Sequence, residues 1–199
     1  MGETAIPAGA EPYDAQAGGE KAGWNVVITL NEGNFFEAQR LLRRWGRVRS
    51  TGFYHVLVMR VADAARFAAE FDAALAESPG ILNVISHVVP ARAAFDFHGA
   101  AEFEARAAET VRGWLGELAG KRFHVRLHRR GLKGVLSTPR EETFLDKGLL
   151  EALQAADTPG RIDFDDPDAV IQIEIVNGRA GLSLWSRDEL RRYGFLGRP

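Results

Sequence analysis

The sequence predicts an α+β protein built from two successive units, and three observations carry this prediction. Residues 24–98 contain four apolar or alternating runs, separated by two amphipathic stretches. A basic run with alternating apolar residues, Arg122–Arg130, follows a third amphipathic stretch. Finally, Asn177-Gly178 stands between two apolar alternating runs, which is the signal of a two-residue hairpin. Strands and helices in this mixed order are typical of an α+β fold.

The composition is that of a globular protein that contains no cysteine. Of the 199 residues, 46% are hydrophobic and 26% are charged, and the formal net charge is −2. The absence of Cys excludes disulfides, thiolate metal ligands and cysteine nucleophiles. Residues 1–23 are rich in Ala, Gly and Glu, so we expect a disordered tail and not a signal peptide. No run is long enough for a membrane span, and a cytoplasmic protein is expected.

The first unit opens with a strand, Trp24–Leu30, in which apolar residues alternate with other residues. A helix should follow Asn34, because Glu37 three residues later completes a capping-box spacing. One apolar stripe of this helix is predicted to face the core: Phe35, Ala38, Leu41, Leu42 and Trp45.

The rest of the first unit adds three strands and a helix. Strands are predicted near Arg47–Thr51, over Phe53–Val61 and over Ile81–Val89. Asp63 should cap the second helix, and Ser78-Pro79-Gly80 should end it. Its inward residues are predicted to be Phe67, Phe71, Ala74 and Leu75. The resulting order βαββαβ is that of a ferredoxin-like domain, which we place at residues 24–98.

The second unit is placed at residues 99–199, after a connector at Phe95–Ala100. A helix marked by Phe103, Ala107, Val111, Trp114, Leu115 and Leu118 should end at Gly120. The basic strand follows it. Thr138-Pro139-Arg140-Glu141 predicts a capped helix start, with Phe144, Leu145, Leu149 and Leu153 inward. Pairing across Asn177-Gly178 should join Val176 to Arg179, Ile173 to Leu182 and Ile171 to Leu184, with Ile175 on the same buried face. Ser186 and Glu189 suggest a last short helix.

The basic run is the main candidate site. Residues 121–140 contain seven Lys or Arg, two His and no acid. Because side chains alternate along a strand, one face should be core and the other should carry cations that meet solvent or an anion. Nucleic-acid phosphate is the leading anion, and ion pairing to neighbouring acids is the alternative. The candidate RNA-binding residues are Lys121, Arg122, His124, Arg126, His128, Arg129, Arg130, Lys133 and Arg140.

Three stretches between Phe103 and Trp185 resemble a THUMP domain: KRFHVRLHRRG, PREETFLDKGLLEAL and RIDFDDPDAVIQIEIVNGRAGLSL. The resemblance implies an RNA-binding module of tRNA-modifying enzymes, with a ferredoxin-like domain in front of it. This chain looks similar to the stand-alone branch, in which an adaptor assists a tRNA cytidine acetyltransferase. The resemblance therefore implies a non-catalytic protein that holds the acceptor stem and 3′ end of tRNA for a separate modifying enzyme, without a cofactor.

Smaller motifs favour structural interpretations. His124 and His128 would chelate one metal on a helix, but four residues of strand separate them by roughly 13 Å. Gly131 to Gly134 has the GxxG spacing of a KH loop, although a flexible turn is the better interpretation. The acids Asp163, Asp165, Asp166 and Asp168 do not fit a calcium loop and predict a turn at a strand entry. No metal site is predicted.

The sequence leaves two roles open for a second basic group, RNA contact and helix-dipole stabilisation. The group consists of Arg40, Arg43, Arg44, Arg47 and Arg49. Arg191, Arg192 and Arg198 are equally ambiguous. Two other functions remain possible from sequence. The ferredoxin-like unit could be a protein-interaction or regulatory module that dimerises or binds a small ligand. A small RNA-processing enzyme could use His124 or His128 with Lys133 as acid–base groups.

Overall fold

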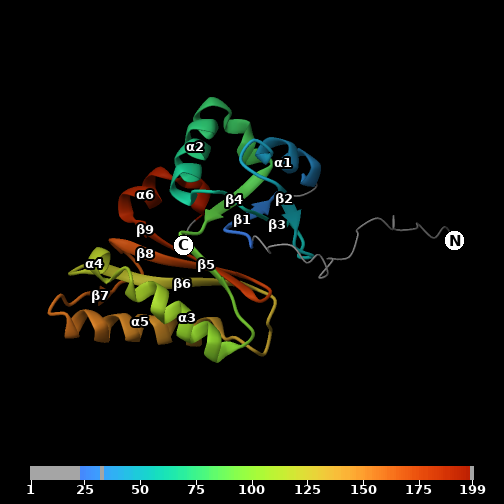
Figure 1. Ribbon diagram of the computed structural model, residues 1–199. Helices are drawn as coiled ribbons and strands as arrows, with labels where there is room; N and C mark the ends of the chain where they lie inside the picture. The colour runs from blue at the N-terminus through green and yellow to red at the C-terminus, as the bar shows by residue number, and fades with distance from the viewer. Residues whose placement is uncertain (1–22, 32–33, 198–199) are drawn as a thin grey trace.

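The computed structural model describes residues 23–31 and 34–197, and it shows two β-sheets between two groups of helices (Figure 1). Helices α1 and α2 lie at the top of the figure, α3 and α5 lie at the bottom, and the strands lie between them. Two large apolar cores follow from this arrangement, one under each group of helices.

The first sheet is antiparallel throughout and has the strand order β2-β3-β1-β4. Its elements are β1 (Val26–Leu30), α1 (Phe35–Leu42), β2 (Val48–Ser50), β3 (Val56–Met59), α2 (Ala64–Glu77), a 3₁₀ turn η1 (Pro79–Asn83) and β4 (Ile85–Pro90). Every predicted element is present, in the predicted order. The strand predicted over Ile81–Val89 is shorter, because the η1 turn occupies its first residues.

Both predicted helix stripes of this unit face its core. In α1 the residues Ala38 and Leu42 are fully buried, and in α2 Phe67 and Phe71 are buried and stack on each other. The cap predicted at Asp63 is confirmed, since its carboxylate accepts a hydrogen bond of 2.9 Å from the Arg66 amide. Asn34 directly precedes α1, as predicted, but its side chain makes no capping bond and donates to the Asn83 carbonyl at 3.4 Å.

The second sheet is mixed, with the strand order β5-β9-β8-β6-β7. Its strands are β5 (Ala93–Asp96), β6 (Arg122–Arg130), β7 (Arg161–Ile162), β8 (Ala169–Val176) and β9 (Arg179–Ser186). Strand β6 runs parallel to β7 and β8, and the other pairs are antiparallel. The helices α3 (Ala100–Arg112), α4 (Leu115–Leu118) and α5 (Thr138–Ala155) contribute to the second core.

The hairpin register is confirmed at all three predicted pairs: Val176 to Arg179, Ile173 to Leu182 and Ile171 to Leu184. Asn177 has a φ of 54°, the left-handed conformation that the two-residue turn requires. The isoleucines of β8 that alternate along it are fully buried in the second core.

Four local predictions for the second unit are wrong. Phe95–Ala100 is not a plain connector, because Phe95 belongs to β5 and is buried in the second core. The helix expected to end at Gly120 breaks at Gly113 into α3 and α4. The cap at Thr138 is absent, since the helix already includes Thr138 and Ser137 precedes it without a side-chain capping bond. Phe144, predicted to point inward, is exposed.

The C-terminal segment crosses back to the first unit. Ser186 and Glu189 form the capping box of α6 (Arg187–Arg192), as the sequence suggests, and a 3₁₀ turn η2 (Gly194–Leu196) follows. Phe195 is buried in the first core, with its ring 5.1 Å from that of Phe71. Strand β5 falls in the first predicted unit but pairs in the second sheet, and η2 falls in the second predicted unit but fills the first core. The division of the chain between residues 98 and 99 therefore stays a prediction.

Close backbone packing also joins the two sheets. A methyl group at Gly181 would lie 2.8 Å from both the Trp24 ring and the Ala91 side chain, so β9 can approach the first unit only without a side chain there. Trp24, Val27 and Val176 form a third apolar cluster together with Val56 and Val58 of β3. The face of β8 and β9 that points away from α3 and α5 is therefore largely covered.

Candidate nucleic-acid interface

Strand β6 has the predicted alternation of apolar and polar faces. Phe123, Val125 and Leu127 are buried in the second core. Parallel pairing sets Arg126 beside Gln172 and His128 beside Glu174, and both of these β8 residues are buried. The face of β6 that carries the cations therefore continues onto β8, where the same face of the sheet is polar but buried. Cations of β6 form ion pairs with acids that lie elsewhere in the sequence.

Arg122, at the start of β6, is committed to a cluster of carboxylates. Its guanidinium donates to Asp166 at 2.7 Å and to Asp168 at 3.0 Å, and its backbone amide also donates to Asp168. Arg187 shares Asp168, at 2.8 Å. The side-chain and backbone hydrogen bonds from Arg122 hold the pKa of Asp168 well below its usual range. Arg122 therefore anchors the β7–β8 connection and is not a free cation.

Arg130, at the far end of β6, is the second committed cation. It donates through Nη1 to Glu174, whose side chain is almost fully buried, and through Nη2 to the Thr29 hydroxyl at 3.3 Å. Thr29 belongs to β1, so this guanidinium connects the two sheets. The charge of Arg130 therefore neutralises a buried carboxylate.

His124 does not match the expectation of an exposed imidazole, because the residue is only 5% exposed. Its Nδ1 is 2.9 Å from the Asp163 carbonyl, and its ring lies 5.1 Å from the Phe164 ring. Asp163 in turn accepts the amides of Asp165 and Asp166, which is the turn geometry predicted for this acidic segment. Among the described residues, no cluster of three His, Asp or Glu could hold a metal ion.

Arg129 and Arg140 also have local partners. Arg129 donates to the Gly131 carbonyl, and Arg140 lies 3.1 Å from Glu104 of α3. Glu104 sits near Glu141, a nearly fully buried residue whose pKa is raised by burial and by the Glu104 charge. The positive charge of Arg140 therefore partly neutralises the two neighbouring carboxyl groups between α3 and α5.

The side chains of four of the nine candidates have neither an ion pair nor a hydrogen bond within the described part of the chain: Lys121, Arg126, His128 and Lys133. Lys121, Arg126 and Lys133 are exposed, and His128 is half-buried. They mark the entry, the middle and the exit of β6. These side chains remain open to a ligand, and we call this set the β6 surface.

The loop after β6 is a turn, as predicted for its two glycines. Gly131 and Gly134 have φ angles of 90° and 83°, and Leu132 between them is also left-handed. A methyl group at Gly131 would lie 3.2 Å from both the Phe53 ring and the Asn177 side chain. The loop that carries Lys133 therefore lies against the β2–β3 connection of the first unit, which brings that unit beside the β6 surface.

The described residues include no helix that is both long and apolar enough to cross a membrane.

Comparison with known proteins supports the fold. No family model and no curated protein matches the sequence. Among solved structures, PH1313 from Pyrococcus horikoshii Ot3 is similar over 81% of this chain and 54% of its own, with a TM-score of 0.55 and 13% identity. TrmN from Thermus thermophilus is similar over 81% of this chain and 44% of its own, with a TM-score of 0.54 and 19% identity.

A 4-thiouridine synthetase, solved as an RNA complex with bound ATP, is similar over 80% of this chain, with a TM-score of 0.50 and 12% identity. The chain spans 40% of that structure's length. At these identities the likeness shows a shared fold, and this chain spans about half or less of each protein.

Proposed function

We propose that this chain is a non-catalytic tRNA-binding protein that presents the acceptor stem and 3′ end of tRNA to a separate modifying enzyme, with a cytidine acetyltransferase as the enzyme suggested by the sequence resemblance. The observation that carries the proposal is the β6 surface, where Arg126 is exposed in mid-strand between Lys121 and Lys133 and lacks an acidic partner within the described residues. Exposed cations without an acidic partner, on a strand and beside its two ends, suit phosphate binding.

The fold supports the same proposal. The strand order β2-β3-β1-β4 in a βαββαβ unit is that of a ferredoxin-like domain, and we assign the first unit to it. We assign the second unit to a THUMP-like domain. The 4-thiouridine synthetase of similar fold was solved with RNA, and we extend RNA binding from that protein to this chain.

The number of open cations sets the expected mode of binding. Three exposed cations on the β6 surface would neutralise about three phosphates. The logarithm of affinity should then fall with the logarithm of salt concentration with a slope of about −2 to −3. A shallow slope of this kind implies modest affinity from this surface alone. Selectivity for tRNA would then require further contacts.

Reversal of charge on the β6 surface tests the proposal. In Arg126→Glu/Lys133→Glu, tRNA affinity should fall at least about tenfold at low salt, and the salt slope should become shallower by about 2, because two phosphate contacts are lost. Fluorescence anisotropy with labelled tRNA across a salt series measures both. The matched control is Arg112→Glu/Lys147→Glu, which makes the same charge change on the exposed side of α3 and α5 and should change affinity less than twofold.

Two results would contradict the proposal. One is tRNA affinity that is undetectable at low salt, or equal for the β6 variant and the control. The other is turnover of tRNA by the pure protein, which would favour an enzyme. A stable homodimer indifferent to RNA would favour the interaction-module alternative. Comparing modified nucleosides in cells with and without the protein would identify the step that it assists.

A further inference from the structure

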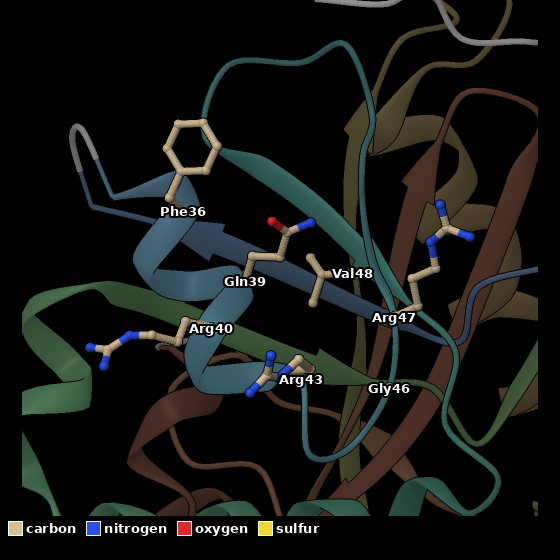
Figure 2. A pocket seen from close by; sticks show the side chains of 7 residues that line it. All are labelled: Phe36, Gln39, Arg40, Arg43, Gly46, Arg47 and Val48. Atoms are coloured by element: carbon tan, nitrogen blue, oxygen red, sulfur yellow. The ribbon is translucent and has the colours of Figure 1, made fainter.

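A pocket of about 520 Å³ opens between α1 and β2 of the first unit, apart from the β6 surface (Figure 2). Its lining includes three arginines and one exposed aromatic ring, and it contains no acid: Phe36, Gln39, Arg40, Arg43, Gly46, Arg47 and Val48. The basic run in the sequence indicates the arginines of this region but not Phe36 or Gln39, because an outward-facing residue of an amphipathic helix leaves no periodic signal.

Two of the arginines are available for a ligand. Arg40 lies 3.5 Å from Glu37, and Figure 2 shows its side chain directed away from Val48. The side chains of Arg43 and Arg47, in contrast, have no ion pair or hydrogen bond within the described residues, and Figure 2 shows them on the two sides of Gly46, with the guanidinium groups pointing in different directions. Two guanidinium groups without acids nearby attract an anion.

Phe36 provides an apolar surface beside these charges. Its side chain is 83% exposed, which is unusual for phenylalanine, and its ring makes an edge contact with Phe35 at 5.5 Å. Figure 2 shows Gln39 between Phe36 and Val48, so an amide lies next to the ring. An exposed ring beside arginines and an amide matches what a nucleotide presents: a base that stacks, a base edge that hydrogen-bonds, and a phosphate.

The elements that frame the pocket are anchored in the core. Val48 is buried, and α1 is fixed by the fully buried Ala38 and Leu42. A methyl group at Gly46 would lie 2.6 Å from the Arg60 carbonyl, so the turn between α1 and β2 packs directly on the end of β3. The spacing between Arg43 and Arg47 is therefore defined by the fold, and the site is partly preorganised.

We propose that the α1–β2 pocket binds one unpaired nucleotide of the RNA, with its base stacked on Phe36 within reach of the Gln39 amide and with the phosphates on its two sides at Arg43 and Arg47, one at each arginine. This inference rests on the proposed function, since it adds a second contact on the same RNA. An acidic peptide would satisfy the arginines but would leave the ring unused. The pocket therefore favours a single-stranded RNA segment over the phosphate backbone of a duplex.

Short oligoribonucleotides test the pocket directly in the full-length protein. The probes are a fluorescein-labelled single-stranded octaribonucleotide and a duplex of the same length. Phe36→Ala should weaken single-strand binding at least about fivefold through lost stacking, and duplex binding less than twofold. Phe36→Trp should retain single-strand binding. Arg43→Ala/Arg47→Ala should weaken single-strand binding and reduce its salt slope by about 1.4.

Controls separate the pocket from general surface effects. Phe144→Ala removes another partly exposed ring, on α5, and Arg66→Ala removes an exposed arginine on α2. Neither should change binding by more than twofold. Melting temperatures equal to that of the parent protein establish that each variant is folded.

The outcomes distinguish this inference from the proposed function. If the β6 variant loses tRNA while the pocket variants bind like the parent, the pocket inference is overturned and the proposed function stands. If the pocket variants lose RNA while the β6 variant does not, the pocket stands and the β6 interface is overturned. Loss of binding in Arg43→Ala/Arg47→Ala but not in Phe36→Ala would overturn the nucleotide site. Binding of a poly-glutamate peptide as tight as that of the octaribonucleotide would also overturn it.

Discussion

Replacing Arg130 with alanine should lower the free energy of unfolding by about 3 kcal/mol, because it leaves the Glu174 carboxylate buried without its cation. Glu174 is only 3% exposed, and the other side-chain hydrogen bond that it accepts among the described residues comes from the Gln172 amide at 3.3 Å. The substitution also removes the hydrogen bond from Arg130 to Thr29 of β1. Urea unfolding at neutral pH measures the loss.

Two variants make this prediction specific. Arg126→Ala, four residues earlier on the same face of β6, removes an exposed cation and should cost less than about 0.5 kcal/mol. Arg130→Met/Glu174→Leu removes both charges together and should recover most of the loss, since an apolar pair can replace a buried ion pair at little cost. Equal stability of Arg130→Ala and Arg126→Ala would contradict the structural role of this arginine.

The Arg126→Ala and Arg130→Met/Glu174→Leu variants also distinguish structural cations from RNA-binding cations. The folded Arg130→Met/Glu174→Leu protein should bind tRNA within about twofold of the parent, whereas an Arg126 variant should bind more weakly while retaining its stability. A cation already held by a buried carboxylate adds little to the attraction of phosphate, because the pair is nearly neutral at a distance. Arg122, with its two close aspartates, belongs with Arg130 in this respect.

Local patterns predicted most of the fold because they report which residues face a core. The register of β8 and β9 follows from Asn177-Gly178 alone, since a two-residue turn leaves one pairing that buries the isoleucines. The alternation of β6 and the stripes of α1 and α2 are correct for the same reason. Contacts made by residues near the C-terminus cannot be predicted from such patterns. Phe195 enters the first core from the far end of the sequence, and a single aromatic residue in a short segment has no period to reveal it.

The candidate site was harder to predict because charge balance in space differs from charge balance along the chain. Residues 121–140 contain no acid, yet Arg122 meets Asp166 and Asp168, which lie more than forty residues away in sequence. The parallel pairing of β6 with β8 brings these acids to the strand, and a long crossover through α5 separates the two strands in sequence. The acidic turn and the basic strand were each visible in the sequence. Their pairing required the sheet order.

Helix α5 contributes a further feature that the sequence did not indicate, on the outer edge of β6. Strand β7 pairs with β6 only at Arg122 and Phe123, so the amides further along that edge need other acceptors. Asp146 of α5 accepts the Val125 amide at 2.9 Å, and Glu142 accepts the Leu127 amide at 2.8 Å. Two carboxylates on one helix thus complete the hydrogen bonding of a strand edge and protect it from pairing with another chain.

This arrangement gives the protein a pH-dependent stability that Asp146→Asn should remove. Burial raises the pKa of Asp146 from its usual value to about 7, and the nearby Glu142 charge adds to this effect. The folded state therefore retains a proton that the unfolded state releases near its ordinary pKa of 3.8. The stabilisation from this group is complete below that value and is lost as the pH rises towards 7, by up to about 4 kcal/mol in total.

Asparagine keeps an oxygen that can accept the Val125 amide but has no proton to lose, so the variant isolates the titration. The difference in unfolding free energy between parent and Asp146→Asn should shift in favour of the variant from pH 4 to pH 7, and should stay constant at higher pH. Urea unfolding at pH steps across this range measures it. Ion-paired acids such as Asp168, whose pKa is lowered, titrate in both proteins and cancel in the difference. A difference independent of pH would mean that Asp146 is ionised in the folded protein at all these pH values, and that its bond to β6 is made by a carboxylate already compensated within the fold.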